Sequence, residues 1–257
     1  MVRRFLCALS VAILILGANS HPSFADMEEA LQAMSDKDHA AVLKELMPLV
    51  ERGDLMAQRL LGHWYIHSAN GDQSMNRAGF ELLLPFAENG DSYMQWLIGS
   101  MFHQGLGVKR DYGQAMYWLR KSADQDYGDA YYFVGEMFAR GKGVPEDKAE
   151  AARWYLLAAN VSDIHAQYRL GIMRMQGDGI SHDLVLAHRW LRLSAAGGYD
   201  KARFALRNLQ EIITPEQIAE AERDGKDWLD NRGDATKRYF ADFHDLEKLL
   251  TAPDAPE

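Results

Sequence analysis

Two histidines four residues apart, His63 and His67, are the first candidates for chemistry in this chain. On a helix, this spacing places two imidazoles on one face, where they could share a metal ion. A zinc-protease motif needs a glutamate directly after the first histidine as general base, and Trp64 stands there instead. Because no third ligand follows nearby, solvated surface histidines explain the pair better, and we expect neither a metal nor a cofactor.

The other residues of catalytic type form no recognisable arrangement. No serine stands at a strand-turn-helix elbow, and the single cysteine, Cys7, lies in an apolar N-terminal run. Gly105-Leu-Gly107 is not a phosphate loop, because it ends a helical pattern instead of opening a helix after a strand. We therefore expect a protein without catalytic residues. The alternative is a hydrolase acting on cell-wall material, for which the histidine pair is the only starting point.

The N-terminus is typical of a secretory signal peptide. Arg3 and Arg4 precede an apolar stretch from Phe5 to Ala18, and Ser23-Phe-Ala25 supplies small residues two apart. The apolar stretch is shorter than the roughly 20 residues that a spanning helix needs. We expect cleavage after Ala25, a periplasmic or secreted location, and no stable membrane span afterwards. An uncleaved anchor is the alternative.

The net charge of the chain argues against one class of partner. The formal net charge is -9, and cleavage would take it to -11 by removing Arg3 and Arg4. An acidic chain repels phosphates, so we expect no nucleic acid as partner. The cleaved chain would hold no cysteine, so its fold needs no disulfide even though export normally permits them.

A short cassette returns at a fixed interval. Gly-Leu-Gly-Val, Gly-Lys-Gly-Val and Gly-Asp-Gly-Ile begin 36 residues apart, and other residue types recur in phase with them. A period of this length is the signature of stacked structural repeats. The in-phase residues that we expect to be structural are Gly99, Gly135, Gly171, the cassette glycines Gly105, Gly107, Gly141, Gly143, Gly177 and Gly179, and Trp118, Trp154 and Trp190.

Each repeat carries two helical patterns separated by the cassette. The first cassette glycine suits the end of the first helix, since glycine adopts the left-handed conformation at little cost. Asp111, Asp147 and Asp183 stand where an N-cap of the second helix is expected, and Glu150 completes a capping box in one copy. Gly135 would let the two helices approach closely, while Trp154 fills the space beside it.

These residues resemble the Sel-1-like repeat (SLR), a relative of the tetratricopeptide repeat (TPR). The family pattern is carried in one copy by Ala130, Gly135, Gly141, Gly143, Asp147, Ala151, Trp154 and Ala159, and in the next by their counterparts 36 residues later. The resemblance covers about residues 27–212. It implies an all-α fold, a right-handed α/α superhelical solenoid of helix hairpins. It also implies that the protein binds protein partners, as members of this family often do in bacterial envelopes.

Weaker copies extend the repeat toward the N-terminus, where Gly62 matches Gly99. The expected organisation is a signal peptide at 1–25, a solenoid at 26–212, a capping helix at 213–230 that begins after Thr214, and a tail at 231–257. The tail carries an amphipathic helix at about 235–250, which serves either as a lid on the last repeat or as an arm for a partner. The expected units are 27–52, 53–89, 90–126, 127–161, 162–197 and a half-unit at 198–212.

Residues that vary between copies indicate where a partner would bind. Counted from the repeated glycine of each first helix, the positions two before, one after and five after share roughly one helical face. Variation within a fixed frame favours exposure, and first helices commonly line the concave surface of such solenoids. An apolar strip with charged ends suits a peptide or a helix; the opposing interpretation is that neighbouring helices cover it. The candidate residues are Leu60, His63, His67, Leu97, Gln104, Phe133, Glu136, Arg140 and Arg169.

The sequence thus predicts an exported, non-catalytic repeat protein that presents a curved surface to a protein or peptide partner in the cell envelope. One version is a periplasmic regulator that docks on the sensor domain of a membrane kinase, although no residue selects it. A ligand-binding SLR protein and a purely structural scaffold inside a larger assembly are further alternatives.

Overall fold

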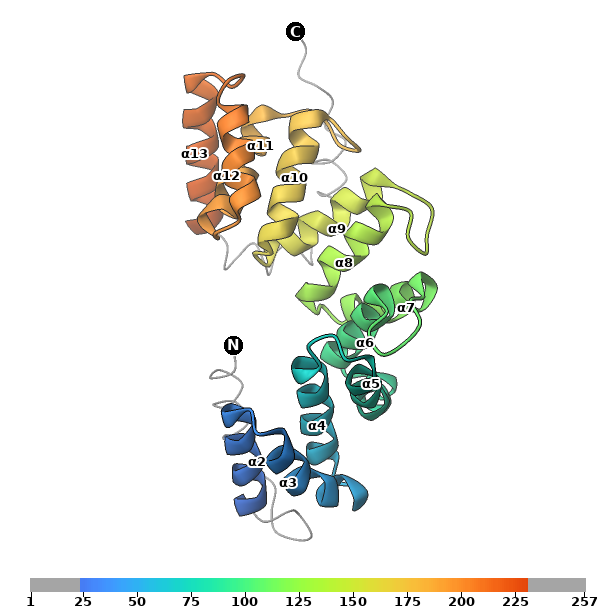
Figure 1. The fold of residues 1–257 in the computed structure, drawn as a ribbon. Coiled ribbons are helices and arrows are strands. Elements are labelled where there is room, and N and C mark those ends of the chain that lie inside the picture. The colour runs from blue at the N-terminus through green and yellow to red at the C-terminus, as the bar shows by residue number, and fades with distance from the viewer. Residues whose placement is uncertain (1–23, 231–257) are drawn as a thin grey trace. The chain divides into compact units, whose positions relative to one another are not determined.

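The computed structural model describes residues 24–230, and every element in that range is a helix (Figure 1). The all-α fold is therefore confirmed for these residues. The expected signal peptide and the tail helix at 235–250 lie outside the described residues, apart from the two residues at 24 and 25. The helices are α2 Phe24–Asp36, α3 His39–Glu51, α4 Leu55–Ser68, α5 Gln73–Glu88, α6 Ser92–Gln104, α7 Tyr112–Ala123, α8 Gly128–Ala139, α9 Lys148–Asn160, α10 Ile164–Gln176, α11 Leu184–Ala196, α12 Asp200–Leu209 and α13 Pro215–Asp230.

The chain divides into two compact units, each with its own buried core. The first contains residues up to 89 together with the loop 105–109, and the second contains 90–104 and the residues from 110 onward. In the first unit, α4 and α5 pack as a hairpin; in the second, α6 packs with α7, α8 with α9 and α10 with α11. Helix hairpins are therefore the repeating element, as a solenoid requires.

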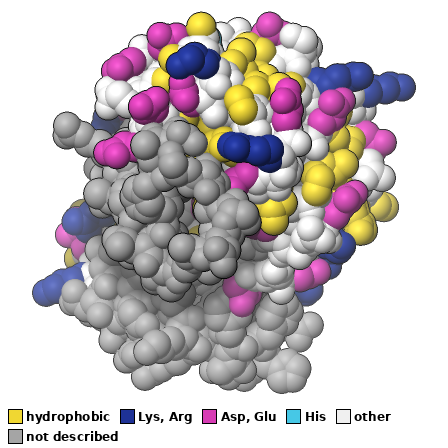
Figure 2. Space-filling model, turned by 90° about the horizontal axis from the view of Figure 1, so that it is seen from below, with side chains coloured by type: hydrophobic (Ala, Val, Ile, Leu, Met, Phe, Trp, Pro, Cys, Tyr) yellow, Lys and Arg dark blue, Asp and Glu magenta, His cyan; other side chains and the backbone are white. Residues whose placement is uncertain are grey.

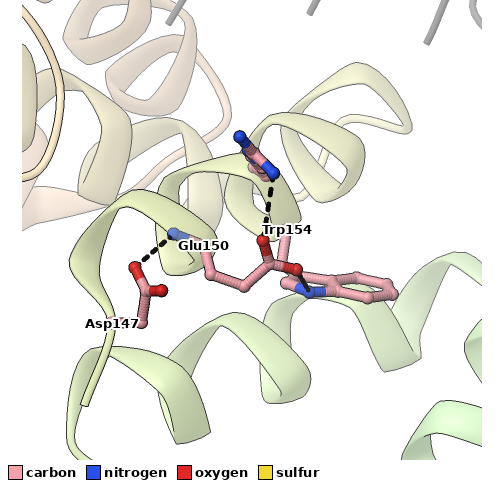
Figure 3. A network of polar contacts seen from close by, with 4 residues as sticks. Asp147, Glu150 and Trp154 are labelled. Carbon is pink, nitrogen blue, oxygen red and sulfur yellow. Dashed lines mark hydrogen bonds and ion pairs between the residues drawn. The ribbon is translucent and has the colours of Figure 1, made fainter. Parts of the chain in front are cut away.

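Aspartates begin the second helix of each hairpin in the second unit, as expected. The side chains of Asp111, Asp147 and Asp183 accept the backbone N–H three residues on, at 2.8–3.0 Å. The predicted capping box at Asp147 is wrong in one respect, which Figure 3 shows: Glu150 turns away and accepts the Trp154 indole N–H at 2.9 Å. The Asp147 amide has no need of Glu150, because it donates to the Phe138 carbonyl at 3.0 Å.

The repeated glycine of each first helix is a contact point between paired helices. A Cβ on Gly135 would lie 2.8 Å from the Tyr155 ring, and Gly99 and Gly171 face Leu119 and Leu191 at similar distances. The predicted close approach is therefore present, but its partner is the residue after each repeated tryptophan. Trp154 itself is only partly buried, with the Arg120 guanidinium 5.6 Å from its ring centre. The expectation that Trp154 fills the core is corrected: Tyr155, 1% exposed, does so.

The second glycine of each cassette packs on the start of the preceding hairpin's second helix. Gly107 lies against the Arg77 backbone and donates its N–H to Gln73 Oε1 at 2.7 Å. Gly143 meets the Tyr112 carbonyl in the same way, and Gly179 meets Lys148. The recurrence of the cassette is explained by this contact, since a side chain at the second glycine would strike backbone.

The C-terminal end of the second unit is closed by α12 and α13. Thr214 caps α13 by accepting the Gln217 N–H at 3.3 Å, and Gln217 Oε1 accepts the Thr214 N–H at 3.0 Å. This reciprocal pair is a complete capping box, and Pro215 occupies the first helical position as predicted.

The surface of the described residues mixes charge types. On the face drawn in Figure 2, acidic and basic side chains are interspersed with apolar ones. Within residues 24–230, every helix is too short or too polar to cross a bilayer.

Candidate functional site

The nine candidate residues fall in both units. Leu60, His63 and His67 lie in the first unit on α4, and the other six lie in the second unit. The histidine rings stack with centroids 5.9 Å apart. Within residues 24–230, no group of three or more His, Cys, Asp or Glu side chains is arranged to hold a metal ion.

The six candidates of the second unit differ in how much of each side chain is exposed to solvent. Gln104 and Arg140 are exposed, and Phe133 and Arg169 are partly exposed. Leu97 is 7% exposed, so the expectation that it faces a partner is wrong. Variation between copies did not indicate exposure at this position, because a helix hairpin tolerates different apolar side chains where it packs on its neighbours.

Three of the candidates meet in one ionic cluster. Glu136 on α8 accepts the Arg140 Nη2–H at Oε2, at 2.8 Å, and the Arg169 Nε–H from α10 at Oε1, at 2.7 Å. The Tyr155 hydroxyl on α9 donates to the same Oε1 at 2.7 Å. Arg169 also lies beside Tyr132, where its charge opposes the rise that burial causes in the pKa of the tyrosine. The sequence placed Glu136, Arg140 and Arg169 on one face, but it did not indicate either tyrosine.

Glu136 is buried, and a buried carboxylate must be compensated by charge and hydrogen bonds. Two guanidinium groups and one hydroxyl supply that compensation here. Burial and the adjacent Glu136 carboxylate raise the pKa of Tyr155 far above its ordinary value, so the hydroxyl stays a donor. The carboxylate therefore holds three helices, α8, α9 and α10, at one point.

Beside the cluster, partly exposed rings form a continuous set that we call the aromatic array. Its members come from the first helices of the hairpins or from the residue that precedes such a helix, and neighbouring ring centroids are 4.7–6.2 Å apart. Phe133 lies on α8, the helix that also carries Glu136, so α8 contributes to both the ionic cluster and the array. The members are Tyr93, Trp96, His103, Tyr127, Tyr132, Phe133, His165, Tyr168 and Tyr199.

Of the residues in the array, only Phe133 was predicted from the sequence, although the sequence contains a pattern that indicates others. Trp96, Tyr132 and Tyr168 recur every 36 residues, each three residues before the repeated glycine. Tyr127 and Tyr199 stand at N-cap positions and make no capping hydrogen bond, whereas Asp163 occupies the same place in the repeat between them and caps α10. Two helices thus forgo a cap worth about 1 kcal/mol and gain a ring on this face.

His103 lies at the edge of the array, between Tyr112 and Phe133. Burial lowers its pKa, and so do the nearby cations Lys142, Arg110 and Arg140, while Glu136 opposes them. Burial also lowers the pKa of His188. Both rings have a buried Nδ1 without a hydrogen-bond partner among the described residues.

These two histidines should make stability depend on pH. Their folded-state pKa values lie below the ordinary value of about 6.5, so the unfolded chain binds more protons and stability falls as pH drops through that value. We expect a lower urea midpoint at pH 5.5 than at pH 7.5, and a smaller difference in His103→Gln. Equal pH dependence in the wild type and His103→Gln would contradict the assignment for His103.

Comparison with known proteins finds the same repeated unit that the helix hairpins form. A family model described as Sel1 repeat matches residues 55–91, 92–127, 128–163 and 164–199, which together make up more than half of the chain. No curated protein matches the chain.

Two solved structures share the fold. One is a protective antigen of uropathogenic Escherichia coli strains displaying an SLR fold, with 22% identity and a TM-score of 0.67 over 80% of this chain. The chain spans only 46% of that antigen. The other is a Sel1 repeat protein from Oxalobacter formigenes, with 23% identity and a TM-score of 0.60, covering 76% of this chain and 83% of that one.

Proposed function

Since the chain belongs to the Sel1 repeat family, we propose that it is a non-catalytic binding protein that holds a protein or peptide partner on the aromatic array. Sel1 repeat proteins generally mediate protein–protein interaction and are generally not enzymes. The partner-binding face consists of the first helices α6, α8 and α10 of the second unit. The array lies at its centre, and Arg140 and Arg169 lie at its edge.

The observation that carries this proposal is the aromatic array itself. Nine rings in contact, all at least partly exposed, present a continuous aromatic surface to solvent, and six of them also pack on the buried cores. Aromatic side chains are enriched at the energetic centres of interfaces, because each buries a large area at a low cost in conformational entropy. Tyr127 and Tyr199 stand at N-cap positions without a capping hydrogen bond. These two residues support the same conclusion, because their rings add to the array and not to the stability of their own helices.

The site of action that we propose is the cell envelope. The support is the N-terminal pattern of Arg3, Arg4 and the apolar stretch that follows, which is typical of a cleaved leader. Within the envelope, a signalling regulator is the more specific version of this function, and its support is the family resemblance alone. N-terminal sequencing of the protein recovered from a periplasmic fraction tests the location; a chain that begins at Met1 in the cytosol would contradict it.

Phe133→Asp is the variant that tests the binding face. It places a charge among Trp96, His103 and Tyr132, and we expect at least a tenfold loss of partner capture from an envelope extract, measured by quantitative mass spectrometry. The matched control is Tyr117→Asp, because Tyr117 is 50% exposed and lies on α7, outside the array. Both variants should retain the helical circular-dichroism spectrum.

Three outcomes decide the result. Loss of the same proteins in Phe133→Asp alone supports the binding face. Equal capture by Phe133→Asp and the wild type would sink the proposal, because the array would then make no contact with the partner. Equal loss in both variants would also contradict it, since the binding surface would not be confined to the array.

A further inference from the structure

The edge of the aromatic array is locally basic, although the chain as a whole carries a net charge of -9. Arg140 and Arg169 both pair with Glu136, so the ionic cluster has one positive charge in excess. Lys142 and Arg110 add to the positive charge around His103. The side chains of Arg140 and Arg169 are 51% and 35% exposed, so this charge reaches solvent.

Each guanidinium retains capacity to bind a further acceptor. A guanidinium carries five N–H donors in a planar fork, and Glu136 accepts one from Arg140 and one from Arg169. Arginine pairs readily with carboxylates because the fork matches the two oxygens. A second carboxylate approaching from solvent would therefore meet two charged donors that Glu136 already holds in position.

Two acidic residues lie at the starts of the helices beside this face. Asp129 is in the first turn of α8, and Arg140 follows its last turn, which puts them about 16 Å apart along the axis at 1.5 Å per residue. That separation is about twice the Debye length of about 8 Å at physiological ionic strength. Asp163 is engaged as the N-cap of α10, where it accepts the Ala166 N–H at 2.7 Å. At its distance of about 16 Å, Asp129 does not cancel the positive charge of Arg140.

Helix dipoles alone do not explain the arrangement. A cation near a helix C-terminus is favourable, and this accounts for Arg140 after α8. It does not account for Arg169, which lies midway along α10. Nor does it explain why two arginines from different helices converge on one carboxylate beside exposed rings.

We propose that the partner is an acidic peptide segment in which an Asp or Glu carboxylate binds Arg140 and Arg169 while a neighbouring aromatic or large aliphatic side chain packs on Phe133. This inference rests on the proposed function and names the chemistry of its ligand. Phe133 precedes Glu136 and Arg140 on α8 by about one and two helical turns, or about 5–10 Å. In an extended peptide, residues two apart are on one side and about 7 Å apart. The recognised pattern is therefore an acidic residue two positions from an apolar one.

Selection from a phage-displayed library of random peptides of about twelve residues tests this directly. We expect wild-type protein to enrich peptides that pair Asp or Glu with an aromatic or aliphatic residue two positions away. For the best-enriched peptide, replacing its acidic residues by the matching amides should weaken binding at least tenfold by fluorescence anisotropy. Added salt should also weaken it, because the arginine edge is exposed.

Variants of the chain complete the test. Arg140→Gln with Arg169→Gln should abolish the acidic enrichment, and Arg140→Gln alone should reduce it while leaving Glu136 paired with Arg169 and Tyr155. The matched control is Arg192→Gln on α11, which removes the same charge from an exposed ion pair with Glu222. The control should enrich the same peptides as the wild type.

The outcomes separate this inference from the proposed function. Enriched peptides without an acidic bias, or no enrichment at all, would overturn the acidic-peptide inference. If Phe133→Asp still abolishes partner capture in that case, the binding face stands and only the ligand chemistry is wrong. If Phe133→Asp leaves capture unchanged, the binding face itself is wrong.

Discussion

Tyr155→Ala should lower the free energy of unfolding by about 3–5 kcal/mol, as deletion of a large core aromatic side chain does. The Tyr155 ring is 1% exposed and lies against Gly135, where the two helices of its hairpin come closest. The substitution also removes the hydroxyl that donates to the buried Glu136 carboxylate. Urea denaturation followed by circular dichroism measures the change.

Two further variants divide this effect into its parts. Tyr155→Phe keeps the ring and removes the hydroxyl, and it should cost about 1–3 kcal/mol because Glu136 loses a donor in a buried site. Trp154→Ala is the control on the adjacent residue; its indole is partly exposed, so it should cost less than Tyr155→Ala. If Trp154→Ala proved as costly as Tyr155→Ala, the tryptophan would contribute to the core as much as the tyrosine, and assigning the core position to Tyr155 alone would be wrong.

This reversal between Trp154 and Tyr155 shows what a repeat pattern reveals and what it conceals. Periodicity identified the hairpins, because an interval of 36 residues leaves few other folds. It did not identify the deepest residue. The tryptophan recurs in three successive copies, whereas the position after it holds Leu119, Tyr155 and Leu191. The three tryptophans differ in burial: Trp118 and Trp190 are buried, whereas Trp154 is partly exposed and donates its indole N–H to Glu150.

The binding face was predictable only in part, for a related reason. Helical spacing placed Phe133, Glu136 and Arg140 on one side of α8, because neighbours three and four apart share a face. It could not show that Arg169 reaches across from α10, or that Leu97 is covered, since both depend on packing between hairpins. The aromatic array was visible as a 36-residue recurrence of Trp96, Tyr132 and Tyr168, but aromatic residues at helical spacing are more often core than surface.

Gly143→Ala should lower the free energy of unfolding by about 2–5 kcal/mol. Two costs add: the left-handed conformation at φ +73°, worth about 1–2 kcal/mol for a residue with a Cβ, and overpacking, worth about 1–3 kcal/mol. The added Cβ would strike the Tyr112 carbonyl, which is backbone and cannot rotate away. The cassette would then be forced off the start of α7. Chemical denaturation measures the loss.

Gly198→Ala separates the two costs, because Gly198 also has a left-handed backbone, at φ +95°, but nothing lies within 4 Å of its Cβ position. It should cost only about 1–2 kcal/mol. The difference between the two variants is the contribution of the contact between the cassette and the preceding hairpin. If Gly143→Ala cost no more than Gly198→Ala, the second cassette glycine would serve only the turn, and its recurrence at Gly107 and Gly179 would need another cause. If the difference reaches 1 kcal/mol or more, the 36-residue repeat is maintained by the fit of each cassette against the hairpin before it.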